Sequence, residues 1–345
     1  MSLRRLGVSA KLPVSRITRE KMPLVLGRKR TGWWRLGLGV LVAVTVVAVV
    51  TAAGCSGAAE APAPDQGDPG EHRSQIESWR EQRDASLRKP DGWLTLAGLY
   101  WLEEGDNSFG SDPANALVFP EGKIDAVAGV LIRNGREVTL LPAAGVALTT
   151  AGAPIAGATL LSLDTSKDGP TIVHSGSLTF YPIERGDMIG VRLKDRESSV
   201  LAEFEGMEYF PIDESWRLIG RYVLFDEPRI LRTPNVLGTV TEEEINGEIR
   251  FDVGGEVRSL RSSGDPAEGF FVVFGDRTNG SETYGGGRFV YTEPVQADGT
   301  VVIDFNKAYC PPCVFTPYAT CPLPPPENKL GLRVEAGEKM FGARH

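Results

Sequence analysis

The residues best suited to chemistry lie in the C-terminal part of the chain, where polar side chains gather around short apolar runs. They are Asp276, Thr278, Tyr284, Arg288, Asp304, Asn306 and Glu338. Two carboxylates such as Asp276 and Asp304 can act as an acid and a base when their surroundings separate their pKa values. Arg288 is suited to pair with Asp304 or with a ligand carboxylate. The set therefore indicates a ligand-binding or hydrolase-type site.

The same stretches also fit a purely structural role. Asp-x-Thr-Asn-Gly at 276–280 is typical of a turn in which Asp and Asn side chains bond to the local backbone. Alternation along a strand would place Asp304 and Asn306 on one face and Phe305 on the other. Three glycines at 285–287 lack the form of a phosphate-binding loop and predict a turn or bulge.

Histidine is scarce, which excludes some classes of site. The chain has only His72, His174 and His345. A Ser-His-Asp or Cys-His arrangement needs an imidazole beside the nucleophile. Only His174 is placed to serve, and no nucleophile motif lies near it. Three widely separated histidines also argue against a histidine-rich zinc site. We expect surface or hydrogen-bonded histidines, no metal and no cofactor.

The cysteines leave several pairings open. If Cys55 is lipidated, as argued below, three thiols remain and cannot all pair within one chain. A Cys313–Cys321 bond would close a loop over 314–320, and a Cys310–Cys313 bond a tight loop containing two prolines. A metal site with three sulfur ligands would lack a fourth ligand of the usual type. A redox Cys-Pro-Pro-Cys pair is weakly supported, because no helix is expected after it.

The N-terminal part has the pattern of a secretion signal. A basic stretch at 28–30 precedes an uncharged apolar run from Leu36 to Gly54, and small residues stand directly before Cys55. This end resembles the lipobox of bacterial lipoproteins, in which the cysteine is acylated and becomes the new N-terminus. Several acyl chains give a stable anchor. The alternative is a single transmembrane helix, for which about 19 apolar residues are just long enough. Met22 is an alternative start of the chain.

Charge divides the chain in two. Residues 1–55 carry ten Lys or Arg and one acidic residue, whereas the rest carries 27 basic and 44 acidic residues, a net charge of −17. An acidic body repels phosphate backbones, so we expect no nucleic-acid partner. The expected partners are the lipid bilayer, through the N-terminal anchor, and a small-molecule or protein ligand. The expected location is the cell envelope, facing the periplasm or the exterior.

Behind the leader (residues 1–55), the sequence predicts a disordered linker over 56–71 and one helix over 72–90. The rest predicts an all-β protein of two packed antiparallel β-domains, a sandwich over 91–200 and a second sandwich or barrel over 201–342 with a Cys/Pro-rich loop. Prolines should keep the loop at 306–328 out of any central strand and fold it back over the second domain. The expected strands are 92–102, 115–119, 129–133, 138–141, 146–150, 177–183 and 188–193, then 207–211, 216–225, 235–241, 248–253, 270–274, 288–292, 300–305 and 330–336.

Three motifs carry a family resemblance: GWLTLAGLYWLEEGDNSFGSDPANALVFP at 92–120, GDRTNGSETYGGGRF at 275–289 and DFNKAYCPPCVFTPYATCPLPPPENKL at 304–330. With AGEK at 336–339, they resemble the family called domain of unknown function 1684, over about Trp79 to Met340. The resemblance implies a bacterial, exported, all-β protein and no established activity. Its motif often has Asn at the position of Cys310, which favours a Cys313–Cys321 disulfide with Cys310 left over.

The first block also resembles a forkhead-associated sandwich, through Gly110-Ser111-Asp112, 115–118 and 183–187. The phosphothreonine pocket of that family needs an Arg after the early Gly and a later Ser-x-x-His. Ser111 takes the Arg position here, and no Ser-x-x-His follows. The resemblance therefore implies the fold without phosphopeptide binding.

Two functions from different classes follow. The first is an exported, membrane-anchored lipoprotein that binds a small molecule, a glycan or a protein. The alternative is a hydrolase-type enzyme using Asp276, Arg288, Asp304 and Glu338. An open pocket that gathers these residues would favour the enzyme, and burial with mutual hydrogen bonding would count against it.

Overall fold

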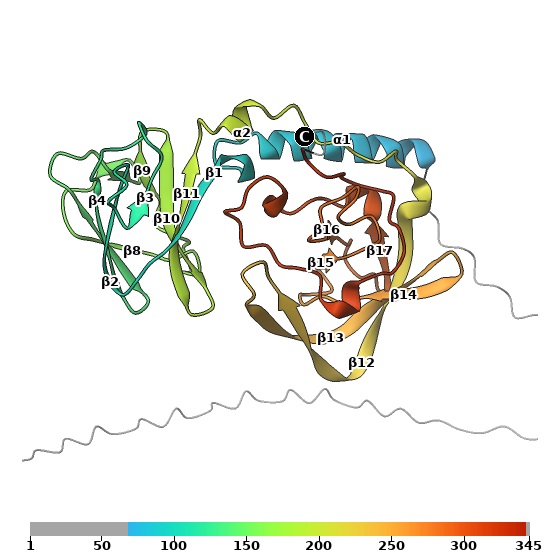
Figure 1. The fold of residues 1–345 in the computed structure, drawn as a ribbon. Coiled ribbons are helices and arrows are strands. Elements are labelled where there is room, and N and C mark those ends of the chain that lie inside the picture. The colour runs from blue at the N-terminus through green and yellow to red at the C-terminus, as the bar shows by residue number, and fades with distance from the viewer. Residues whose placement is uncertain (1–67, 343–345) are drawn as a thin grey trace, which may run out of the picture. The chain divides into compact units, whose positions relative to one another are not determined.

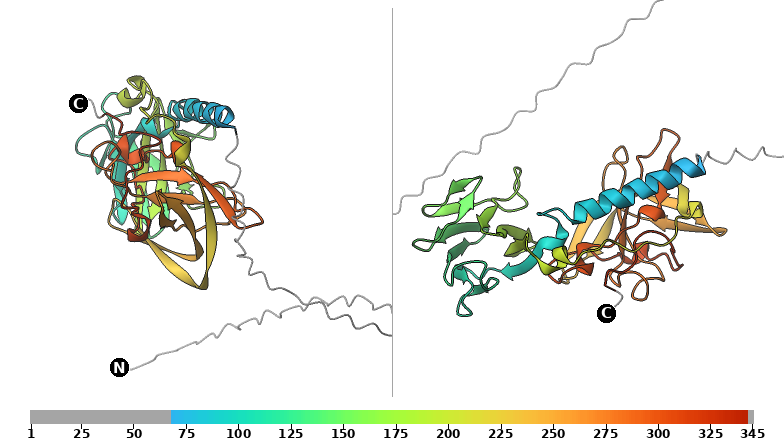
Figure 2. Two further views of the ribbon diagram at one scale, coloured as in Figure 1. Left: turned by 90° about the vertical axis from the view of Figure 1, so that its right-hand side faces the viewer. Right: turned by 90° about the horizontal axis from the view of Figure 1, so that it is seen from above.

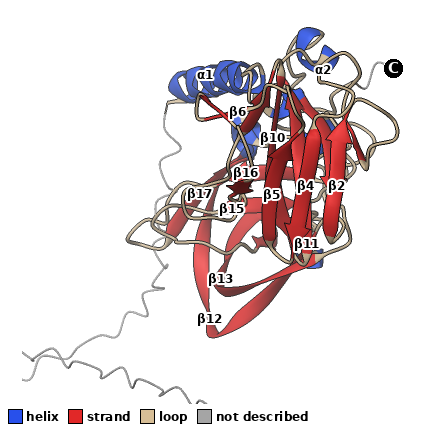
Figure 3. Ribbon diagram, turned by 90° about the vertical axis from the view of Figure 1, so that its left-hand side faces the viewer, coloured by secondary structure: helices blue, strands red, loops and turns tan. Residues whose placement is uncertain are grey.

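The computed structural model describes residues 68–342. Cys55, the apolar run before it and most of the expected linker lie outside the described residues. Strands dominate the described part, and one long helix leads into it (Figure 1 and Figure 3). The expected all-β fold class with one N-terminal helix is therefore confirmed. No helix within residues 68–342 is long and apolar enough to cross a membrane.

The leading helix, α1 (Pro69–Leu87), begins three residues before the expected position, inside the predicted linker. Its start follows from local chemistry. The Asp68 side chain caps the helix by accepting a hydrogen bond from the Gly70 N–H at 2.9 Å, and proline occupies the first helical position. Ile76 and Leu87 are buried. Figure 2 shows α1 lying along the C-terminal part of the fold.

The first β-region is a sandwich of two sheets. One sheet has the order β1 (Leu96–Trp101), β11 (Met188–Asp195), β10 (Leu178–Arg185), β9 (Val173–Ser175), β6 (Thr149–Thr150), β7 (Ala153–Pro154). The other has the order β3 (Leu117–Val118), β2 (Gly105–Gly110), β4 (Gly129–Asn134), β5 (Glu137–Pro142), β8 (Thr159–Leu161). The expected strand at 92–102 starts only after a 3-10 turn, η1 (Trp93–Thr95). Strand β2 was not expected, because its Gly, Asp, Asn and Ser residues are typical of a turn.

The two sheets share one apolar core. Phe109, Phe119 and Phe180 meet there, with ring centroids 5.4 to 5.5 Å apart. Alternation along β10 and β11 sends every second side chain into this core, including Phe180 and Leu193. The remaining side chains of these strands therefore lie on the outer face of the sheet.

The second β-region begins after α2 (Ser199–Ala202) and η2 (Glu214–Trp216). Its main sheet has the order β14 (Glu256–Leu260), β13 (Val240–Val253), β12 (Arg217–Pro234), β17 (Thr300–Asp304), and a separate hairpin pairs β15 (Phe271–Phe274) with β16 (Arg288–Tyr291). The expected strand at 235–241 is wrong over most of its length, because Asn235 and Gly238 form the turn between β12 and β13. No strand forms at 207–211, where Tyr209 makes only an isolated bridge.

The C-terminal segment, residues 305–342, has no regular strand, and the expected strand at 330–336 is wrong. It is held by 3-10 turns and single bridges instead: η3 (Phe305–Lys307), η4 (Pro312–Val314) and η5 (Pro326–Asn328). The Leu330 N–H donates to Gly275 O at 2.9 Å, and the Leu323 N–H donates to Pro234 O at 2.7 Å. Cys321 packs with Val273. The segment therefore lies against β12 and the β15–β16 hairpin.

Candidate functional site

Arg288, the first residue of β16, forms a buried clamp with Asp276, just beyond β15. The Arg288 Nη2 lies 2.8 Å from Asp276 Oδ2, and both side chains are fully buried. Arg288 also donates to Val334 O at 2.7 Å and Ala336 O at 2.5 Å. It thereby ties the C-terminal segment to the hairpin. The expectation that Arg288 pairs with Asp304 is wrong, because Asp276 faces it across the loop.

Neighbouring residues of the loop that follows β15 also hydrogen-bond to the Asp276 carboxylate. Its Oδ1 accepts from the Thr278 N–H at 2.7 Å and the Thr278 hydroxyl at 2.6 Å. Thr278 and Thr283 also share a hydrogen bond of 2.8 Å. Tyr284 lies apart from this network beside Cys313, and burial raises its pKa to about 12. These contacts match the turn chemistry that 276–280 indicated.

Asp304 belongs to a different network, at the end of β17. Its Oδ2 lies 2.8 Å from the Nε2 of His72 on α1, and its Oδ1 accepts from the Asn306 N–H at 3.0 Å. Asn306 in turn bonds to the backbone of Asp213. The expected strand alternation through 304–306 is wrong, because the strand ends at Asp304 and η3 begins. Phe305 is fully buried in the core.

Glu338 forms a third network, also with α1. Its carboxylate lies 2.8 Å from Arg83 Nε and accepts from the Cys310 N–H at 2.7 Å. Burial raises the pKa of Glu338, and Arg83 acts against that rise. The carboxyl group is fully enclosed, so substrate has no path to it in this conformation.

The predicted site residues thus divide among separate buried networks. The carboxylates of Asp276, Asp304 and Glu338 each have their own nitrogen-bearing partner side chain, and each network joins separate segments of the chain. Buried charges held in this way stabilise a fold only while both partners are present. Their arrangement supports a structural role and does not support an acid–base pair in one cavity.

The three C-terminal cysteines are free thiols in the structure. The Cys313 N–H donates to Cys321 Sγ at 3.2 Å, so these two residues are neighbours, and their disulfide stays a prediction. A hydrogen bond from Cys321 lowers the pKa of Cys313 to about 7, and burial raises the pKa of Cys310 to about 12. No cluster of three His, Cys, Asp or Glu residues suited to a metal ion occurs between residues 68 and 342.

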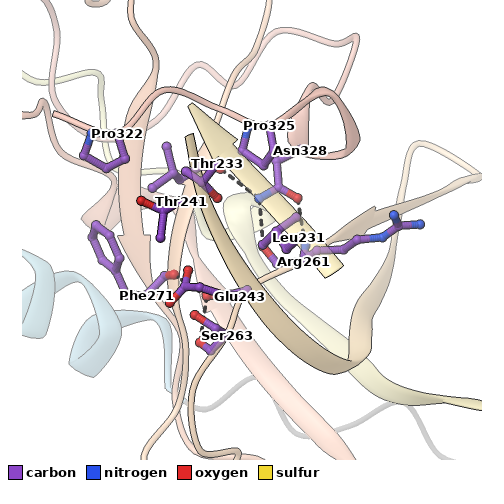
Figure 4. A pocket seen from close by; sticks show the side chains of 12 residues that line it. Leu231, Thr233, Thr241, Glu243, Arg261, Ser263, Phe271, Pro322, Pro325 and Asn328 are labelled. Atoms are coloured by element: carbon purple, nitrogen blue, oxygen red, sulfur yellow. Dashed lines mark hydrogen bonds between the residues drawn. The ribbon is translucent and has the colours of Figure 1, made fainter. Parts of the chain in front are cut away.

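Two cavities lie beside the C-terminal segment. One, of about 290 Å³, is lined by Thr233, Thr241, Phe271 and Asn328 (Figure 4). Arg261 also borders it, but its charge is matched by Glu248 at 3.1 Å and Glu327 at 3.5 Å. A second cavity, of about 450 Å³, lies beside the glycines at 285–287 and Pro324. Glu243 also lines the first cavity, and Arg277 and Lys329 line the second; none of these three side chains forms an ion pair within the described residues.

A larger cavity, of about 610 Å³, opens on the outer face of the first sandwich, and we call it the basic pocket. Most of its polar lining comes from three neighbouring strands, β9, β10 and β11: His174, Thr179, Tyr181, Arg192, Lys194 and, just beyond β11, Arg196. Asp91 and Asp164 line it as well. Pairing places Thr179 opposite both His174 and Lys194, and Tyr181 opposite Arg192. These side chains therefore share one face of the sheet.

Arg192 lies deepest among these residues. It is 5% exposed, its Nε has no hydrogen-bond partner in the described structure, and an Nη donates to Thr320 at 3.3 Å. Lys194 is half-buried and donates to Asp91 O at 2.5 Å. Burial lowers the pKa of Lys194, and the neighbouring charge of Arg192 lowers it further. The pocket is therefore positively charged and partly shielded from water.

The sequence analysis missed this pocket. The available signal was the spacing of Arg192, Lys194 and Arg196 at every second position along β11 and just past its end, which favours three cations on one face. The alternation of Thr179 and Tyr181 on the preceding strand supports the same face. The sequence alone did not show that β9 and β10 lie beside β11, so it did not reveal that these charges meet at one cavity.

Comparison with family descriptions matches residues 202–339 to "Protein of unknown function (DUF1684)". The chain belongs to the DUF1684 family. A solution NMR structure of an uncharacterized protein from Haloarcula marismortui is 32% identical, over 42% of this chain and 80% of that one, with a TM-score of 0.34. A comparison with curated proteins gave no match.

The DUF1684 match is narrower than the resemblance expected from the motifs, which began near Trp79. It contains the Asp276–Arg288 clamp, Asp304, Glu338 and all three C-terminal cysteines. The strands that carry the basic pocket precede it. The Asp276–Arg288 clamp thus lies wholly within the DUF1684 region, whereas Asp304 and Glu338 pair with His72 and Arg83 of α1, outside it. The basic pocket lies in the sandwich before that region.

Proposed function

We propose that this DUF1684 protein is an exported lipoprotein, held in the cell envelope through Cys55, whose folded part binds a small molecule in the basic pocket. The observation that carries the binding function is the cavity of about 610 Å³ on the outer face of β9, β10 and β11. Cavities of this size are typical of small-molecule sites. A binding role also accords with the enclosure of the predicted catalytic carboxylates.

The envelope location is supported by the N-terminal sequence. The basic stretch, the apolar run and the small residues before Cys55 occur in the order of a cleaved signal. The charge contrast between this leader and the acidic body is the second support. A transmembrane helix formed by the same run would hold the body on the same side of the membrane without lipid.

Lipidation is tested by metabolic labelling with a palmitate analogue, comparing wild type with Cys55→Ala. A Ser56→Ala variant is the matched control, because it changes the neighbouring residue and leaves the thiol. We expect label and signal cleavage in the wild type and in Ser56→Ala, and neither in Cys55→Ala. Unlabelled, full-length wild-type protein in the membrane fraction would support the transmembrane helix instead.

Small-molecule binding is tested on purified protein that has been exposed to envelope extract. Native mass spectrometry should find a mass adduct on the folded protein that disappears on denaturation. The adduct should be reduced in a Tyr181→Ala variant, because Tyr181 lines the basic pocket. Tyr291→Ala is the control, since this exposed tyrosine lies on β16. Absence of any adduct, or equal retention by both variants, would contradict the proposed site.

A further inference from the structure

The basic pocket gathers three positively charged side chains on one face of a sheet. None of Arg192, Lys194 and Arg196 forms an ion pair with a carboxylate in the described part of the chain. Two carboxylates, Asp91 and Asp164, also line the pocket. Asp164 is already paired with Arg185 at 2.7 Å. Asp91 accepts a hydrogen bond from Lys194 through its backbone carbonyl, and its carboxylate acts on Lys194 through space. Three cations therefore face the cavity with little opposing charge.

The burial of Arg192 is a second, independent feature of the basic pocket. A guanidinium that is 95% enclosed is costly unless anions or acceptors satisfy it. Within the described residues its guanidinium has one side-chain hydrogen-bond partner, the hydroxyl of Thr320 at 3.3 Å, and its Nε has no partner. Arg192 also lowers the pKa of the Cys313 thiol, which belongs to the same C-terminal segment as Thr320. A free donor remains on the pocket residue itself.

We infer that the basic pocket binds a small organic anion through a carboxylate or phosphate group held by Arg192 and Lys194. The inference rests on the proposed small-molecule function and names its ligand class. Arginine suits this task, because its fork of N–H donors matches the oxygens of carboxylate and phosphate. Arg196 and His174, both exposed at the pocket, lie where they can meet a second charged or polar group.

The remaining lining sets the size and character of the ligand. Ile172, Pro90 and Pro170 provide apolar surface, and the ring of Tyr181 adds a flat face. A volume of about 610 Å³ exceeds that of a bare inorganic ion and fits a compact organic molecule. A long polyanion is disfavoured by the net negative charge of the body. The recognised molecule is therefore small, with an anionic end and an apolar or ring-shaped part.

The test is titration calorimetry of the purified protein with three probes: citrate, glucose 6-phosphate and neutral glucose. We expect saturable one-to-one binding of at least one anion, weakening with added salt, and none for glucose. Citrate and glucose 6-phosphate separate a carboxylate site from a phosphate site. Arg192→Gln should weaken anion binding by about tenfold or more, as expected for a lost hydrogen bond to a charged group.

Because Arg192 is buried, its replacement can disturb folding, so Lys194→Gln provides a second variant at a half-buried position. Arg232→Gln is the matched control. This exposed arginine of β12 is paired with Glu242 at 2.7 Å, and its loss changes net charge equally. We expect Lys194→Gln to weaken binding and Arg232→Gln to leave it unchanged.

Two results would overturn the inference. One is the absence of saturable binding for both anions at millimolar concentration. The other is equal weakening by Lys194→Gln and Arg232→Gln, which would reveal only a general charge effect. If the protein instead retains a neutral molecule from envelope extract, the anion inference fails and the proposed binding function stands. If it also retains no molecule there, both fail.

Discussion

Replacing Arg288 with methionine is the sharpest test of the claim that the predicted catalytic cluster is structural. The side chains of Arg288 and Asp276 are fully buried, and the hydrogen bonds of Arg288 to Val334 and Ala336 join the β15–β16 hairpin to the C-terminal segment. Methionine has a similar length and no charge. The change would leave the Asp276 carboxylate buried without its cation, and it would remove the donors that Val334 and Ala336 now use.

The magnitude follows from these contacts. Breaking a buried ion pair from one side typically costs ~3–5 kcal/mol, because one charge stays uncompensated. Each buried carbonyl left without a donor adds ~1–3 kcal/mol, although such terms do not simply add. Asp276 keeps its hydrogen bonds from Thr278, which reduces the cost somewhat. We expect the free energy of unfolding to fall by about 4 kcal/mol, a large share of the ~5–15 kcal/mol typical of a domain.

The assay is guanidinium chloride unfolding followed by tryptophan fluorescence. Arg277→Met is the matched control, because it makes the same substitution at an exposed arginine that directly follows Asp276. Its free energy of unfolding should stay within ~0.5 kcal/mol of the wild-type value. Adding Asp276→Asn to Arg288→Met removes the stranded charge and should recover ~1–3 kcal/mol. If Arg288→Met unfolds like Arg277→Met yet loses bound ligand, the structural account is refuted and the ligand role returns.

Three further predictions concern a turn, the thiols and the helix. Gly287→Ala should destabilise the protein by ~2 kcal/mol or more in the same unfolding assay, because its added Cβ would lie 2.4 Å from Pro324 Cγ. Gly280→Ala, at a similar positive φ but with open space around it, should cost less, and an equal loss would argue against the clash. In the reduced protein, alkylation should modify Cys313 with a midpoint near pH 7 and leave buried Cys310 unmodified; the opposite order would contradict the burial of the two thiols. His72→Leu should lower the free energy of unfolding by ~1–3 kcal/mol, since a buried aspartate loses its partner, and an unchanged midpoint would show that α1 does not depend on this contact.

Local sequence patterns predicted the helix and those strands in which apolar residues recur at regular spacing. Alternating apolar residues located β10 and β11 within two residues at each end. Helical spacing located α1, although the capping by Asp68 moved its start. Sequence patterns failed where pairing with a distant strand, or its absence, outweighs the local preference of the residues for a strand or a turn. Strand β2 consists of turn-forming residues and exists because β4 pairs along its length, whereas the apolar stretch 330–336 packs in the core without strand pairing.

The sequence by itself determined the β-rich class, the acidic body, the secretion-like leader and the residues able to carry charge. These properties depend on composition and on neighbours a few residues away. Only the tertiary structure decided which charges meet. It joined Asp304 to His72 across 232 positions and Glu338 to Arg83 across 255. The residues predicted to form a catalytic site therefore make buried structural contacts instead. Within residues 68–342 the tertiary structure also placed Arg192 and Lys194 together at a cavity with no ion pair to a carboxylate. Such pairings arise from long-range packing, which brings distant segments together and sets the burial that makes an unpaired charge costly.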